Sequence, residues 1–162
     1  MGTGRFVLAV LAAALGGLDG AARGGFYDAA VLADNPVRYY RLGEASGPTA
    51  IDISSYGGHG TYNNLAAGDF AKPGALTADP NTSVWLNGSN ATVTAPDANE
   101  LDLLADIAIE FWYRKTAEAG DWQRIVGKGD SAANRRNYGV WEPGGPTGAC
   151  CSSSTTPAAA PC

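Results

Sequence analysis

The sequence predicts an all-β protein made of antiparallel strands. The stretch "ADIAIEFWYRKT" (Ala105–Thr116) alternates in polarity, and successive side chains of a strand point to opposite faces. Other short apolar runs recur at intervals of roughly ten to twenty residues, with turn residues between them. From Phe26 onward no segment keeps the 3.6-residue period of a helix, and only "ANELDLLAD" is expected to form a single turn. This combination favours a sandwich or a barrel.

Composition agrees with this fold class. The chain has 162 residues, enough for one domain, and its 22 glycines suit a turn-rich β protein. Its net charge of −5 argues against nucleic acid as a partner, because a phosphate-binding surface needs clustered lysine and arginine.

The first 22 residues are expected to be a signal peptide. Arg5 precedes the apolar run Phe6–Leu15, and the small residues Gly20, Ala21 and Ala22 follow. A run of this length matches the hydrophobic region of a secretory signal and is too short to span a bilayer. A buried helix or a wrongly chosen start codon are the alternatives.

Strands are expected at intervals along residues 26–142. The Pro36–Leu42 stretch opens on a proline, whose missing N–H suits a strand start. A glycine-rich loop follows, with a short strand at Gly60–Asn63, and then a hairpin at Ser83–Pro96 that turns around Asn87–Asn90. The remaining strands are expected within Ala105–Thr116, Trp122–Asp130 and Arg136–Pro143.

Residues 143–162 differ from the rest of the chain. They consist of Gly, Pro, Ser, Thr, Ala and Cys, without a bulky apolar residue, so they cannot bury enough area to offset their ordering entropy. We expect a disordered tail. It holds all three cysteines, Cys150, Cys151 and Cys162, whose spacing gives neither a disulfide framework for the body nor a metal site.

Several motifs along residues 26–142 resemble a known family. They are "RLGE" (Arg41–Glu44), "DIS" (Asp52–Ser54), "HGTY" (His59–Tyr62), "IEFW" (Ile109–Trp112), "IVGKGD" (Ile125–Asp130) and "NYGV" (Asn137–Val140). In order and spacing this set resembles the laminin G-like (pentraxin-type) domains of the concanavalin A-like lectin and glucanase superfamily. The resemblance implies an antiparallel jelly-roll sandwich of two curved sheets. Such sandwiches often need about 200 residues, so the chain is expected to hold an incomplete, C-terminally truncated domain.

Trp112 raises the question of a ligand, because it lies on the otherwise polar face of its expected strand, beside Glu110. Burying a tryptophan removes ~150–250 Å² from water, an upper bound of about 4–6 kcal/mol. A covered structural tryptophan is therefore the favoured interpretation, for Trp85, Trp122 and Trp141 as well. The functional alternative is a ligand-binding face with Trp112, Glu110 and Trp122, of which Trp122, at a loop end, is expected to be the most exposed tryptophan.

Calcium is the candidate cofactor. It needs several oxygen ligands, and domains of the resembled family often bind it. Asp52, in a glycine- and serine-rich loop, is the first candidate ligand and Glu44 the second. The alternative is that Asp52 accepts a hydrogen bond within its own turn.

Catalytic signals are weak. Glucanases of the superfamily carry Glu-x-Asp-x-x-Glu on one strand. Here Glu100-x-Asp102 begins this pattern, but Ala105 stands where the second glutamate belongs, and the match precedes the expected strand instead of lying inside it. His59, the single histidine, lies between glycines with no nucleophile elbow in the chain, and is expected to be a loop residue.

We therefore expect a non-enzymatic, extracellular recognition module that binds carbohydrate or a protein partner. It would belong to a larger secreted or phage-tail-like protein, with the virion surface as the alternative location. The alternative functions are a degenerate glucanase-type domain and a non-functional fragment.

Overall fold

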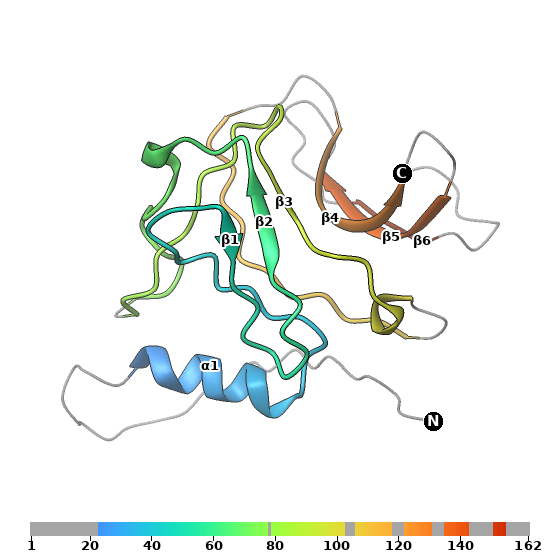
Figure 1. Ribbon diagram of the computed structural model, residues 1–162, viewed down its shortest axis with the longest axis horizontal. Coiled ribbons are helices and arrows are strands. Elements are labelled where there is room, and N and C mark those ends of the chain that lie inside the picture. Colours follow the sequence, from blue (N-terminus) through green and yellow to red (C-terminus); the bar gives the residue numbers. More distant parts are fainter. Residues whose placement is uncertain are drawn as a thin grey trace. The chain divides into compact units, whose positions relative to one another are not determined.

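The computed structural model describes residues 23–77, 79–102, 106–117, 122–130, 135–142 and 151–154. The chain divides into two compact units, Met1–Glu100 with Leu104–Tyr113 and Leu101–Leu103 with Arg114–Cys162. In its described part each unit holds one three-stranded antiparallel sheet (Figure 1). The predicted predominance of antiparallel strands is thus confirmed, and the jelly-roll arrangement stays a prediction. The expected signal segment, residues 1–22, lies outside the described residues.

The described part of the first unit opens on helix α1 (Arg23–Ala33), which corrects the expectation that no helix occurs from Phe26 onward. Alanine and leucine favour the helix in its second half. It ends where Asn35 adopts a left-handed φ of 50°, immediately before Pro36, which cannot continue it. Tertiary contacts also hold it, because Asp28 accepts a hydrogen bond from Tyr39 Oη at 2.6 Å. A hydrophobic period in the sequence does not report such tertiary contacts, so it could not predict this helix.

The sheet of the first unit has the order β1–β2–β3. Strands β1 (Thr49–Ala50), β2 (Gly60–Asn63) and β3 (Thr92–Thr94) are short, and β2 confirms the strand expected at those residues. Alternate residues of β2 are buried, and Tyr62 packs edge-on against Phe70 with ring centroids 5.0 Å apart. Ala50 completes this small core at 0 % exposure.

The hairpin expected at Ser83–Pro96 is wrong in its pairing, although its turn is confirmed. Ser83 pairs with Lys72, whereas β3 pairs with β2. The turn is held by Asn87, whose Oδ1 accepts the backbone N–H groups of the second, third and fourth residues after it at 2.9, 3.1 and 3.0 Å. The turn is therefore encoded locally, while the strands on either side of it find partners elsewhere.

Two further expected strands are corrected. Pro36–Leu42 contributes only one bridge, Tyr40 with Asp52, because the carboxylate of Asp52 takes the Tyr39 N–H that would continue a ladder. Ala105 of the stretch Ala105–Thr116 lies outside the described residues, and residues 106–117 form no strand. Most of the expected core face of this stretch is exposed, with Phe111 at 40 % and Tyr113 at 50 %, while Ile109 is half-buried. An alternating segment becomes a strand only where a partner pairs with it.

The second unit confirms two strands and corrects one expectation. Strands β4 (Gln123–Asp130) and β5 (Arg135–Glu142) pair antiparallel, with register shifts along β4. Strand β6 (Cys151–Ser154) pairs with β5, although residues 143–162 are expected to be disordered. The backbone of β6 supplies ladder hydrogen bonds that need no bulky side chain. The remainder of the expected tail lies outside the described residues.

Candidate functional site

An aromatic and acidic cluster, formed by Tyr27, Glu110 and Trp112, joins α1 to the extended segment of the first unit. Tyr27 Oη donates to Glu110 Oε1 at 2.6 Å and accepts from Trp112 Nε1 at 3.0 Å. The two rings lie 6.4 Å apart, centroid to centroid, at an angle of 59°. One hydroxyl thus fixes both a tryptophan and a carboxylate.

The side chains of Glu110 and Trp112 in this cluster are exposed to solvent. Trp112 is 62 % exposed, and Glu110 is exposed as well. Burial, followed by the hydrogen bond to Glu110, raises the pKa of Tyr27 above its ordinary value of 10.0, so the hydroxyl stays protonated and donates. The second oxygen of Glu110 has no hydrogen-bond partner in the part of the chain that the structure describes. The cluster therefore presents a fixed aromatic surface beside a carboxylate oxygen that can accept further hydrogen bonds.

The favoured interpretation of Trp112 as a covered tryptophan is wrong. Its edge is anchored to Tyr27, and more than half of its surface faces solvent. Trp85 is also exposed, at 45 %, whereas Trp141 is half-buried. Trp122 belongs to the second unit, where it precedes β4 with 52 % exposure. The covered interpretation is therefore wrong for Trp122 as well, and Trp112 rather than Trp122 is the most exposed tryptophan among the described residues.

Of the predicted ligand-binding residues, the structure thus brings Glu110 and Trp112 together. Sequence reasoning missed Tyr27, which joins them. No local signal could have found it, because it lies 83 residues before Glu110 in the chain, on a helix that was not expected.

Asp52, the first candidate calcium ligand, is a buried structural carboxylate. Its Oδ1 accepts the N–H groups of Tyr39 and Ser54, both at 2.9 Å. Its Oδ2 accepts the Ser54 hydroxyl and the Gly58 N–H, again both at 2.9 Å, and Arg38 Nε lies 3.8 Å away. The bond from Ser54 N–H is the within-turn hydrogen bond of the alternative interpretation. This donor set does not fit a cation site, because each oxygen of Asp52 already faces donors from the protein.

The electrostatics of Asp52 follow from the same contacts. Burial alone would raise its pKa, but the backbone hydrogen bonds from Tyr39, Ser54 and Gly58, with that from the Ser54 hydroxyl, outweigh burial. Together they lower the pKa of Asp52 below its ordinary value of 3.8. The backbone N–H of Asp52 itself donates to His59 Nδ1 at 3.1 Å, which places the histidine in this loop rather than in a catalytic array.

Glu44, the second candidate calcium ligand, is also engaged by the protein. It accepts the Ile51 N–H at 2.8 Å through Oε1 and the Tyr62 hydroxyl through Oε2. Within the described ranges no group of three or more His, Cys, Asp or Glu side chains is placed to hold a metal. Calcium binding stays a prediction, for which these two carboxylates offer no assembled site.

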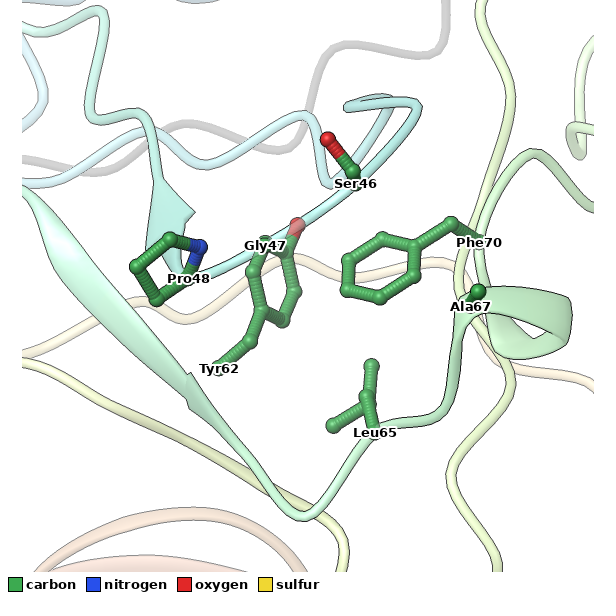
Figure 2. Close-up of a pocket in the computed structure, with 7 residues that line it drawn as sticks. All are labelled: Ser46, Gly47, Pro48, Tyr62, Leu65, Ala67 and Phe70. Atoms are coloured by element: carbon green, nitrogen blue, oxygen red, sulfur yellow. The ribbon is translucent and has the colours of Figure 1, made fainter.

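A shallow hollow of about 370 Å³ lies beside the core of the first unit (Figure 2). Its floor is the edge-to-face pair of Tyr62 and Phe70, and Leu65 points into the same space. The rim is formed by Ser46, Gly47, Pro48 and Ala67. The hollow is the open margin of the apolar core and has no charged lining residue, so it offers less chemistry than the aromatic and acidic cluster.

The carboxylates of the incomplete glucanase pattern have structural partners. Glu100 Oε1 lies 3.4 Å from Arg38 Nη1 in the first unit, and Asp102 pairs with Lys128 in the second. Ala105 lies outside the described residues.

Comparison of the chain with protein-family models, with curated proteins and with solved structures gave no match in any of the three. The resemblance to laminin G-like domains therefore stays a prediction. Among the described residues, no helix has the length and apolar character needed to cross a membrane.

Proposed function

We propose that the protein is a non-catalytic recognition module that binds carbohydrate through the face formed by Tyr27, Glu110 and Trp112. The observation that carries this proposal is the exposed indole of Trp112, held at its edge by Tyr27 Oη while that hydroxyl also holds Glu110. A fixed aromatic ring offers large contact area at a small entropic cost on binding. The neighbouring carboxylate can accept hydrogen bonds from sugar hydroxyls, which are the stronger, charge-assisted kind.

The chemistry of the site favours neutral sugars. The apolar face of a pyranose ring can stack on the indole while its hydroxyls reach the free oxygen of Glu110. Glu110 would repel a uronic or sialic acid, whose carboxylate would share the same small site. We also propose the concanavalin A-like jelly roll as the fold class. It is supported by the antiparallel strands of both units and by the order of the motifs shared with laminin G-like domains.

A glycan array followed by titration of each bound sugar tests the proposal. Trp112→Ala removes the stacking surface and is expected to weaken binding about tenfold or more, since stacking contacts are worth ~0.5–1.5 kcal/mol beyond the area they bury. Trp85→Ala is the matched control, because Trp85 is an exposed tryptophan of the same unit whose side chain makes no hydrogen bond within the described part.

Glu110→Gln keeps an acceptor for Tyr27 but removes the charge. We expect it to weaken the binding of neutral sugars and to reduce the discrimination against acidic ones. Absence of binding to every glycan, or equal losses in the Trp112→Ala and Trp85→Ala variants, would contradict the proposed site. Cleavage of a bound polysaccharide would contradict the non-catalytic role.

A further inference from the structure

The backbone of residues 106–112 has no pairing partner among the residues that the structure describes. Within the described part of the chain, none of its N–H or C=O groups makes a hydrogen bond to another protein group. Figure 1 shows the segment as an extended stretch, coloured light orange. Unpaired backbone groups must be hydrated, since burial without a partner is costly. At least one edge of this segment therefore faces water.

The segment has the composition of a strand. Ile107, Ile109 and Phe111 alternate with Ala108 and Glu110, and β-branched and aromatic residues are enriched in strands. Ile107 is 39 % exposed and Phe111 is 40 % exposed, so part of its apolar face is still in water. An exposed, unpaired, apolar strand is a template for pairing with another chain.

We propose that a second copy of the chain pairs with residues 106–112 in an antiparallel, two-fold symmetric β ribbon centred on Ile109. In a two-fold antiparallel pair the residue on the axis faces itself, and residues equally far on either side face each other. Ala108 then lies opposite Glu110, Ile107 opposite Phe111, and Asp106 opposite Trp112. Every pair keeps both side chains on one face, and no pair places like charges together.

The neighbouring symmetric registers are worse for electrostatic reasons. An axis on Ala108 would place Asp106 opposite Glu110 in both halves of the ribbon. An axis on Glu110 would place that carboxylate opposite its own copy. Like charges directly opposite each other in a sheet are destabilising. Among the three registers centred on Ala108, Ile109 and Glu110, the charge pattern therefore selects the one centred on Ile109, which also pairs the whole of residues 106–112.

Pairing has a consequence for the proposed sugar site, although the ribbon does not depend on sugar binding. The two Trp112 residues lie on the same face of the ribbon, each three residues from the axis. At ~3.4 Å per residue they are separated by about 20 Å along the strands. The pair could therefore engage two sugars of one polysaccharide, which raises avidity without a new contact.

Disulfide trapping of the full chain tests the register. In the proposed ribbon only residue 109 faces its own copy, so Ile109→Cys is expected to form a 109–109 disulfide under mild oxidation. The matched control, Ile107→Cys, faces Phe111 and is expected not to link to its copy. Peptide mapping by mass spectrometry separates these links from those of Cys150, Cys151 and Cys162.

Sedimentation velocity as a function of protein concentration tests the pairing without cysteine chemistry. Ala108→Glu places a second carboxylate opposite Glu110 in each half of the ribbon, and is expected to weaken dimerisation about tenfold. Ala108→Lys, at the same half-buried position, places an opposite charge there and is expected to strengthen it. A monomer at every concentration, or a dimer equally stable in both variants, overturns the proposal.

Hydrogen exchange distinguishes pairing with a second copy of the chain from coverage of the segment by another part of the same chain. Alternate amides of residues 106–112, those on the paired edge, are expected to be protected only at concentrations where the dimer forms. Protection that is independent of concentration would mean that another part of the same chain covers the segment, and would overturn the proposal. Sugar binding by a persistent monomer would leave the proposed function standing while the ribbon fails.

Discussion

Replacing Asp52 by asparagine is the sharpest test of how the first unit is held together. The substitution keeps the shape of the side chain and removes its charge. The retained oxygen can still accept the N–H groups of Tyr39 and Ser54. The new NH₂ group takes the place of Oδ2, where it meets the Gly58 N–H and Arg38 Nε, both of which are donors. A donor that faces donors satisfies neither side.

The cost can be worked out from these contacts. Leaving the Gly58 N–H without an acceptor costs about 1–3 kcal/mol, and hydrogen bonds to a charged acceptor are stronger than those to a neutral one. Together these losses amount to about 2–4 kcal/mol. With a urea dependence of ~2 kcal/mol per M, in the middle of the range for small proteins, the unfolding midpoint should fall by roughly 1–2 M.

The pH dependence gives an independent check. The folded-state pKa of Asp52 lies below its ordinary value of 3.8, so the ionised carboxylate stabilises the fold above about pH 4. This stabilisation is lost as the pH falls through the lower, folded-state value. The difference in unfolding free energy between the parent and the Asp52→Asn variant should therefore be constant near neutral pH and shrink below about pH 4.

Urea unfolding followed by circular dichroism at several pH values measures both effects. Asp106→Asn is the control, because Asp106 is exposed and makes no hydrogen bond or ion pair with the residues that the structure describes. It should change stability by less than about 0.5 kcal/mol. An Asp52→Asn variant as stable as the parent, or a loss of stability that does not change on acidification, would refute this role of Asp52.

Two other substitutions test local elements of the first unit. Asn87→Ala removes the acceptor of three backbone N–H groups in an exposed turn and should cost about 1 kcal/mol in urea unfolding, whereas Asn87→Asp should cost less, since it keeps the acceptor. Burial, followed by the hydrogen bond to Glu44, raises the pKa of Tyr62 above 10.0. The protonated hydroxyl of Tyr62 therefore stabilises the fold fully below about pH 10, and this stabilisation is lost as the pH rises through the folded-state pKa. Tyr62→Phe should therefore be less stable than the parent at neutral pH, by about 1–2 kcal/mol, and the gap should narrow under alkaline conditions; a constant gap would contradict this assignment.

The sequence predicted those elements whose information is local. The sequence predicts the strand at Gly60–Asn63, the turn at Asn87–Asn90 and the strands β4 and β5, because alternation and turn residues lie within a few positions of one another. The single turn expected around Asn99 is also present, as the 3-10 helix Asn99–Leu101.

The elements that were missed depend on partners far away in the chain. Helix α1 is tied down through Tyr27 and Asp28, whose partners are separated from it in sequence. The strand expected at Pro36–Leu42 loses its ladder to a side chain, the carboxylate of Asp52. The alternation of apolar and polar residues does not reveal that a side chain will compete with a neighbouring strand for a backbone N–H group. For the same reason only part of the candidate site is predictable from the sequence. Glu110 and Trp112 are predicted, whereas Tyr27 reaches them only through the tertiary fold.

The segment around Ile109 shows most clearly what an alternating pattern does and does not specify. Alternation fixes which residues share a face, and the structure does place Glu110 and Trp112 on one anchoring hydroxyl. It does not supply the neighbouring strand, because backbone pairing is a contact between two segments. A segment with a defined face and free backbone groups keeps the capacity to pair. The same residues can therefore present a sugar-binding surface on one face and a strand-pairing edge along the backbone. Substitutions of Trp112 test sugar binding, and substitutions of Ala108 test pairing, so the two activities can be separated.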